Sequence, residues 1–150
     1  MSSSSSTIIP RNVHFLALVH GMWGTPEHLA RVEETIKEKY ADVEGDTEFV
    51  SLRIRTNAES HTYDGLDWGA ERAVKEIYQT VEEIESDGHK KVAKFSIFGY
   101  SLGGLISRYT IGSTVFSING VSSAISNPSI LPPLPHPIWA YRGYEVLSAQ

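Results

Sequence analysis

The chain has 150 residues, a formal net charge of −5 and no cysteine. Its length allows one domain, its charge argues against nucleic acid as a partner, and the lack of cysteine excludes disulfides and thiolate metal sites. The serine-rich start lacks the basic and apolar parts of a signal peptide, and no apolar segment reaches the length of a membrane span. We therefore expect a soluble protein, at most peripheral to a membrane, with no metal and no cofactor.

The first predicted elements are a buried strand, a glycine-rich loop and a helix. Residues 13–19 are almost all apolar, as in a strand buried on both faces. The loop His20-Gly21-Met22-Trp23-Gly24 follows, and Thr25 and Pro26 have the residue types of an N-cap and a first helical position. Apolar residues then recur at helical spacing, at Leu29, Val32, Ile36 and Tyr40.

A second strand and a second helix come next. Residues 48–55 alternate between apolar and polar, which predicts a half-buried strand. A polar loop over 56–67 leads to a helix that ends near Gly88, a residue suited to a C-cap. Its apolar stripe is Ala70, Ala73, Val74, Ile77, Val81 and Ile84, and we expect its acidic residues Glu82, Glu83 and Glu85 to face solvent rather than bind metal.

The most informative motif lies between the third predicted strand and the third predicted helix. Val92, Phe95, Ile97 and Phe98 indicate the strand, and Leu102, Leu105, Ile106 and Tyr109 indicate the helix. Between them, Gly99-Tyr100-Ser101-Leu102-Gly103 matches Gly-x-Ser-x-Gly, the nucleophile elbow of α/β-hydrolases. The alternative is a phosphate-binding turn of a nucleotide-binding sheet, but neither glycine-rich phosphate motif occurs in the chain.

The order of elements predicts a partial α/β-hydrolase fold. Strands that alternate with helices form a parallel sheet with helices on both faces. Residues 1–11 are expected to be a disordered tail, 12–112 the nucleophile-bearing half of the hydrolase, and 113–150 a low-charge, proline-rich tail of irregular structure. The later strands of the complete fold are expected to be missing.

Acyl transfer at Ser101 also requires two N–H donors for the oxyanion that forms. In this architecture one donor is the amide after the nucleophile, here Leu102, and the other comes from a loop after an earlier strand. The Met22 amide is the candidate for the second donor, because His20-Gly21 lies where that loop is expected. We expect His20 to order the loop by hydrogen bonding and not to act as the catalytic base.

Three segments together resemble the putative serine esterase family of lipase-like α/β-hydrolases, over about Val13 to Gly112. They are His14-Phe15-Leu16-Ala17-Leu18-Val19-His20-Gly21-Met22-Trp23-Gly24, His61-Thr62-Tyr63-Asp64-Gly65-Leu66-Asp67, and Phe95-Ser96-Ile97-Phe98-Gly99-Tyr100-Ser101-Leu102-Gly103-Gly104-Leu105-Ile106-Ser107-Arg108-Tyr109. The resemblance implies Ser101 as nucleophile, His20-Gly21 as oxyanion loop and a lipid ester as substrate. Because several members are lipases or phospholipases of membranes or lipid droplets, it also implies a cytoplasmic protein, either free or at such a surface.

The role of the 61–67 segment is open at this point. His61 or Asp64 could border the site. Equally, Asp67 could cap a helix and Asp64-Gly65 could form a turn. Trp23 and Trp68 are expected to make ordinary packing contacts, with insertion into a lipid interface as the alternative.

The sequence departs from the family where the other catalytic residues should follow. After Ser101 the chain has no Asp, one Glu (Glu145) and one His (His136), in the reverse of the acid-then-histidine order of α/β-hydrolases. A truncated product is the simplest explanation. Three hypotheses follow: a serine esterase, an inactive product that binds lipid or a protein partner, and an interaction module that uses the proline-rich tail.

Overall fold

The computed structural model describes residues 9–41, 45 and 47–112, together with three two-residue strands further along the chain. The elements of the main part are β1 (Arg11–Val19), η1 (Pro26–Leu29), α1 (Ala30–Ala41), β2 (Thr47–Arg53), η2 (Glu59–Tyr63), α2 (Leu66–Glu85), β3 (Lys90–Gly99) and α3 (Leu102–Gly112). The short strands are β4 (Ser117–Ile118), β5 (Val121–Ser122) and β6 (Tyr144–Glu145).

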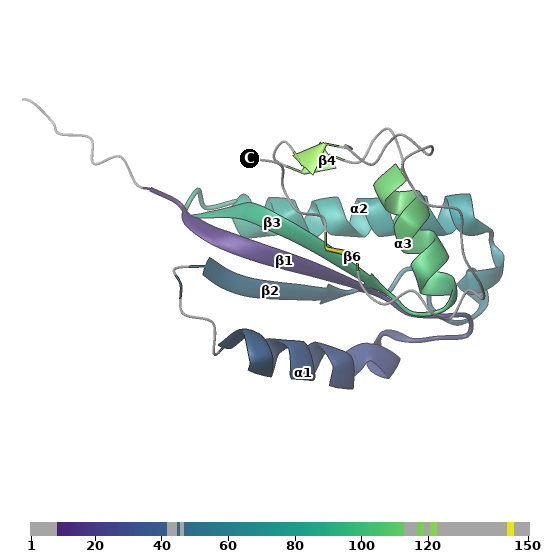
Figure 1. Cartoon of the computed structure of the whole chain (residues 1–150). Helices are drawn as coiled ribbons and strands as arrows, with labels where there is room; N and C mark the ends of the chain where they lie inside the picture. Colours follow the sequence, from purple (N-terminus) through teal and green to yellow (C-terminus); the bar gives the residue numbers. More distant parts are fainter. Residues whose placement is uncertain are drawn as a thin grey trace, which may run out of the picture.

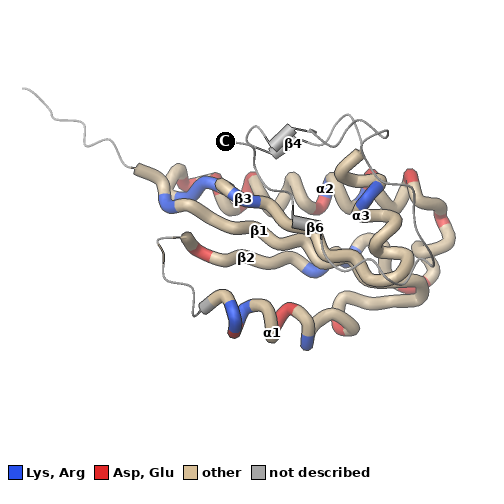
Figure 2. Tube along the Cα trace, in the orientation of Figure 1, with Lys and Arg blue, Asp and Glu red and all other residues tan. Residues whose placement is uncertain are grey.

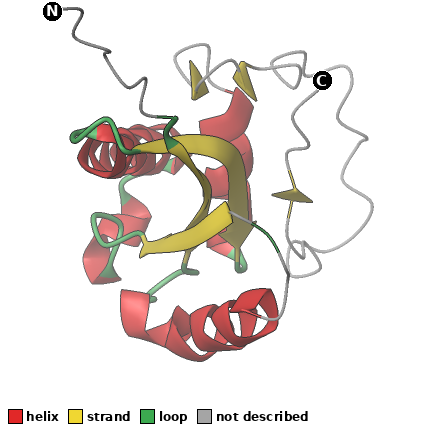
Figure 3. Cartoon of the chain, turned by 90° about the vertical axis from the view of Figure 1, so that its left-hand side faces the viewer, coloured by secondary structure: helices red, strands yellow, loops and turns green. Residues whose placement is uncertain are grey.

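The sheet has the strand order β2-β1-β3-β6. β1 pairs in parallel with both β2 and β3, which confirms the predicted parallel sheet. The sheet lies between two helical layers, with α1 on one face and α2 and α3 on the other (Figures 1 and 3). β1 lies between β2 and β3 and is covered by helices on both faces. Its residues from Val13 onward are therefore buried, as the apolar run predicted.

Each face of β1 contributes to a separate core. Phe15, Ala17 and Val19 join the larger core beneath α2 and α3, which also contains Ile77, Phe95, Ile97 and Ile106. Leu16 and Leu18 point to the opposite face and pack with Leu29, Val32 and Ile36 of the η1–α1 segment. This alternation follows from the two-residue period of a strand. It fixes the register of β1 and therefore the position of the loop that follows Val19.

Several predicted boundaries and exposures differ from the structure. β1 begins at Arg11, inside the expected N-terminal tail, and η2 forms within the expected polar loop. α2 begins after Gly65 as N-cap, so Asp67 does not cap it. On α3, Tyr109 belongs to the residues that indicated the helix, but its side chain is exposed. The buried face of the helix consists of Gly103, Gly104, Ile106, Ser107, Thr110 and Ile111.

The last part of the chain adds one short strand to the sheet. β6 pairs antiparallel with β3, with Glu145 opposite Ser96 and Tyr144 opposite Ile97. The proline-rich segment around residues 128–137, and residues 1–8 of the expected disordered tail, lie outside the described residues.

Basic residues gather at the amino end of the sheet, away from the loops that follow the strands (Figure 2). Arg11 lies opposite Lys90 in the pairing of β1 with β3, and Lys91 and Lys94 follow on β3. Lys90 Nζ is 2.8 Å from Glu48 Oε1 of β2. The loops at the carboxyl ends of β1 and β3 meet at the other end of the sheet.

Candidate active site

Ser101 occupies a sharp turn between β3 and α3. Its φ angle is +54°, a left-handed conformation that is unfavourable for a residue other than glycine. Three backbone hydrogen bonds enforce the turn: Tyr100 N to Val19 O (3.0 Å), Gly103 N to Tyr100 O (2.9 Å) and Gly104 N to Ser101 O (2.9 Å). The bond to Val19 ties the elbow to the end of β1, so the neighbouring strand positions the serine.

The two glycines of the motif are required by close backbone approach. A Cβ atom at Gly99 would lie 2.6 Å from Gly103 C and Gly104 Cα. A Cβ atom at Gly103 would lie 2.5 Å from His20 O, a backbone atom that cannot move aside. Both positions therefore exclude a larger residue, which explains the spacing Gly-x-Ser-x-Gly in physical terms.

The loop after β1 lies directly against the elbow. A Cβ atom built at Gly21 would be 3.2 Å from both Ser101 Cβ and Tyr100 O. The structure therefore brings together residues that are 80 positions apart in the sequence. Met22, the residue expected to supply the second oxyanion donor, is the next in the chain.

His20 and Gly24 hold the peptide unit that carries the Met22 amide. The Gly21 carbonyl accepts from His20 Nδ1 at 3.0 Å and from Gly24 N at 2.9 Å. A carbonyl oxygen can only accept, so Nδ1 carries the proton. In a planar trans peptide the Met22 N–H points away from the Gly21 oxygen, so these two bonds set its direction.

The amides of Met22 and Leu102 have no hydrogen-bond partner among the described residues, whereas those of Gly103 and Gly104 are both used in the turn. Two unpaired amides beside Ser101 are what an oxyanion hole requires. His20 does not hydrogen-bond to Ser101. Its Nε2 atom is buried without a partner among the described residues.

The 61–67 segment, whose role the sequence left open, packs against this loop. Glu59 N of η2 donates to Gly24 O at 3.0 Å, and Trp23 N donates to Thr62 Oγ1 at 3.4 Å. Asp64 pairs with Arg72 of α2, and His61 Nδ1 lies 3.2 Å from Asp64 Oδ2. The hydrogen bond from Arg72, followed by that from His61, lowers the pKa of Asp64. No spacing rule predicts that this segment meets the loop, because about 40 residues separate them.

Large apolar side chains are exposed on the loop after β1, on the elbow, on η2 and at the start of α2. Met22, Trp23, Tyr63 and Tyr100 are each more than half exposed, and Trp68 is 60% exposed. Trp23 and Tyr63 form an edge-to-face pair with ring centroids 4.9 Å apart. Trp23 thus makes a packing contact, as expected, while the rings of Trp23 and Trp68 both stay more than half exposed. The helix and loop that carry them leave their rings at the surface.

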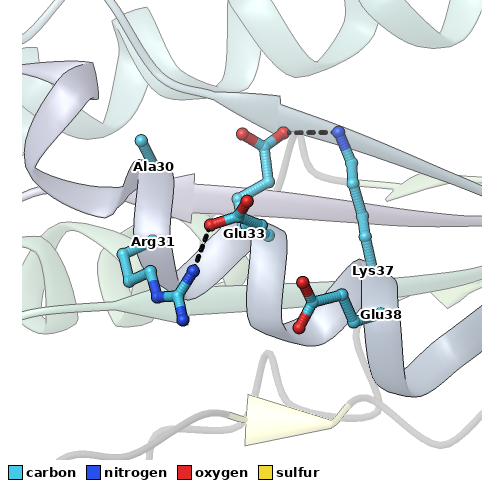
Figure 4. Close-up of a pocket in the computed structure, with 6 residues that line it drawn as sticks. Ala30, Arg31, Glu33, Lys37 and Glu38 are labelled. Carbon is cyan, nitrogen blue, oxygen red and sulfur yellow. Dashed lines mark hydrogen bonds and ion pairs between the residues drawn. The ribbon is translucent and has the colours of Figure 1, made fainter.

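The described residues line two hollows of interest. One of about 420 Å³ adjoins the loop and is lined by residues that include Met22, Leu29, Val32, Phe98 and Tyr100. The other, about 630 Å³, lies along α1 and is lined by residues of this helix alone (Figure 4). Four of its five charged residues are paired with one another, Arg31 with Glu34 and Lys37 with Glu33. Of these two, the first includes Tyr100 of the elbow in its lining and the second does not.

The described residues do not complete a catalytic triad. No side chain among them hydrogen-bonds to Ser101 Oγ, and His136 lies outside the described part of the chain. Glu145 is placed by its backbone on β6, opposite Ser96. Among the described residues, no group of three or more His, Asp or Glu side chains could hold a metal ion, and no helix is long and apolar enough to cross a membrane.

A parallel sheet between two helical layers, with a strained serine at a strand-to-helix turn, defines a partial α/β-hydrolase fold. The family model described as "Putative serine esterase (DUF676)" matches residues 10–128, and the chain belongs to this family. The match extends past residue 112, where the sequence resemblance was expected to end. No curated protein matches the chain.

Proposed function

We propose that this chain is a serine hydrolase that cleaves carboxylic esters of lipids by nucleophilic acyl transfer, with Ser101 as the nucleophile. The observation that carries the proposal is the strained φ of +54° at Ser101. This residue lies against the loop that bears the Met22 amide, which has no hydrogen-bond partner among the described residues. Backbone strain of this kind costs about 1–3 kcal/mol and persists where function requires it.

The reaction has two halves, acylation of Ser101 and hydrolysis of the acyl-enzyme. Each half forms one C–O bond at the carbonyl carbon and breaks another. Ser101 Oγ attacks the ester carbonyl carbon, a general base removes the hydroxyl proton, and the carbonyl oxygen takes up negative charge between the Met22 and Leu102 amides. The C–O bond to the alcohol then breaks, and the alcohol leaves with the proton. Water hydrolyses the acyl-enzyme by the same steps. Removal of one oxyanion donor in comparable enzymes raises the barrier by about 3–4 kcal/mol.

The exposed apolar residues support a lipid ester over a small polar one. Met22 and Tyr100 flank the loop and the elbow, and the adjoining hollow of about 420 Å³ also has Leu29, Val32 and Phe98 in its walls. Clustered exposed aromatic residues favour contact with apolar ligands or membrane interfaces. On this proposal the protein is cytoplasmic and acts at the surface of a membrane or lipid droplet.

A second candidate is a catalytically inactive product that binds lipid or a protein partner. The observation that favours it is the absence, among the described residues, of any hydrogen bond to Ser101 Oγ. Without a base, a serine hydroxyl is a weak nucleophile, and the oxyanion donors alone give only a small acceleration.

A fluorophosphonate probe separates the two candidates, because it reacts covalently only with an activated serine. The serine esterase is expected to be labelled in the wild type and in Ser86→Ala, which alters an exposed serine at the end of α2, but not in Ser101→Ala. Absence of labelling in the wild type would favour the inactive product. Equal labelling of Ser101→Ala would refute the assignment of the nucleophile.

A further inference from the structure

The oxyanion loop contains a strained residue that needs support from outside the loop. Gly24 N bonds to Gly21 O and closes a turn in which Trp23 has a φ of +54°. Glycine or asparagine normally occupies such a position, because a side chain with a bulky ring disfavours the left-handed region. Contacts from the rest of the fold must therefore hold the Met22–Trp23 peptide in place.

η2 supplies those contacts. Trp23 N–H donates to Thr62 Oγ1 at 3.4 Å, and the Thr62 hydroxyl itself donates to Glu59 O at 2.8 Å. Because its one proton is used on Glu59, the hydroxyl presents lone pairs towards Trp23. Thr62 is 9% exposed, so water has little access to replace this contact.

η2 also holds the far end of the loop, and η2 is itself anchored to α2. Glu59 N donates to Gly24 O at 3.0 Å, one residue beyond Trp23. Arg72 of α2 pairs with Asp64 and donates from Nη1 to Thr56 O at 3.2 Å, so it fixes the chain on both sides of η2. The Trp23–Tyr63 ring contact adds a further link between loop and turn.

We propose that Thr62 is a positioning residue for the oxyanion loop. Its hydroxyl holds the Trp23 amide, and the planar Met22–Trp23 peptide transmits that constraint to the backbone of Met22. This gives the 61–67 segment a function at the site without contact with the substrate. The contacts above support the claim that Thr62 holds the loop. The claim that this aids acyl transfer at Ser101 rests on the proposed function.

Amide hydrogen exchange measured by NMR on the full chain tests the holding of the loop without requiring activity. In the wild type, the Trp23 amide is expected to exchange at least about tenfold more slowly than in an unstructured chain. Thr62→Val, which keeps the shape but removes the acceptor, is expected to raise that exchange rate at least about fivefold. Thr62→Ser is expected to restore it. Tyr100, whose amide bonds to Val19 O, serves as an internal reference.

Thr80→Val is the matched control, because the Thr80 hydroxyl donates to Glu76 O within α2 and has no contact with the loop. It is expected to leave Trp23 exchange unchanged. An unprotected Trp23 amide in the wild type, or equal exchange in wild type and Thr62→Val, would overturn the inference.

Fluorophosphonate labelling then tests the consequence for the site. Thr62→Val is expected to label at least about fivefold more slowly than the wild type, and Thr62→Ser to recover the rate. Faster Trp23 exchange with an unchanged labelling rate would overturn the positioning role. If the wild type does not label at all, the proposed function fails, and the exchange rates alone decide whether Thr62 holds the loop.

Discussion

Gly21 and Ser101 are in direct contact across two loops that end adjacent parallel strands. A Cβ atom at Gly21 would come within 3.2 Å of Ser101 Cβ. The contact exists because β1 and β3 pair in register up to Val19 and Gly99, so their following loops leave the sheet side by side. The predictions below follow from this junction and from the contacts that hold it.

Gly21→Ala should disturb the site without unfolding the protein. The added methyl group would press on Ser101 Cβ and Tyr100 O, both at 3.2 Å, so loop and elbow must separate by a few tenths of an ångström. Misplacement of about 1 Å at a reacting centre can cost about a hundredfold in rate, so we expect fluorophosphonate labelling to slow by about tenfold. Gly112→Ala, with nothing within 4 Å of the new atom, is the control. Equal labelling rates in both variants would show that the loop tolerates the methyl group.

Ser101→Gly should make the protein more stable while it abolishes labelling. Glycine adopts a φ of +54° without steric cost, so the free energy of unfolding is expected to rise by about 1 kcal/mol. Ser86→Gly, at a residue with a φ of −57°, should instead lower it by a few tenths of a kcal/mol. Chemical denaturation measures both. A loss of stability in Ser101→Gly would contradict the presence of strain at the elbow.

Glu76→Ala should destabilise the segment that leads from β2 to η2. The Glu76 carboxylate is buried and accepts hydrogen bonds from Arg55 N at 3.0 Å, Thr56 N at 3.1 Å and Thr56 Oγ1 at 2.9 Å. Removal leaves these donors unpaired, which costs about 2–3 kcal/mol. Glu71→Ala, at an exposed position of the same helix, is expected to change stability by less than about 0.5 kcal/mol. Similar losses in the two variants would refute this role of Glu76.

Glu33 should contribute to acid sensitivity. Burial alone would raise the pKa of Glu33, but hydrogen bonds from Ser51 and Lys37, with the charges of Lys37 and Arg53, outweigh it and lower the pKa below its ordinary value of 4.5. A lowered pKa gives stability that is fully present above the unfolded value and is lost as the pH falls through the folded value. In urea unfolding between pH 3 and pH 7, the free energy of unfolding should therefore fall less with decreasing pH for Glu33→Gln than for the wild type.

The control for Glu33 is Glu34→Gln, which removes a more exposed carboxylate from the same helix. If Glu33→Gln and the wild type lose stability in parallel below pH 5, the Ser51 and Lys37 contacts do not stabilise the charged form.

Local patterns in the sequence predicted most of the fold. The apolar run of β1 is continuous because the strand is covered on both faces, and the stripe of α1 matches the residues that pack against Leu16 and Leu18. The motif around Ser101 could be recognised from five consecutive residues. The structure adds the reason for its second glycine, because a Cβ atom at Gly103 would clash with the backbone of His20 directly after β1. Helical spacing indicated α3 but did not show that Tyr109 would be exposed, because the buried face of this helix also uses the small residues Gly103, Gly104, Ser107 and Thr110.

The sequence by itself determined the strand-helix order, the Gly-x-Ser-x-Gly turn at Ser101 and the family, because each is carried by short segments whose residues are near one another in the chain. Only the tertiary structure decided that Thr62 and Glu59 meet the loop after β1, and that Trp23 and Trp68 stay at the surface. The contacts with the loop depend on the position of η2, which Arg72 of α2 anchors through Asp64 and Thr56 O. Pairing between distant segments is set by packing, and no local period in the sequence encodes it.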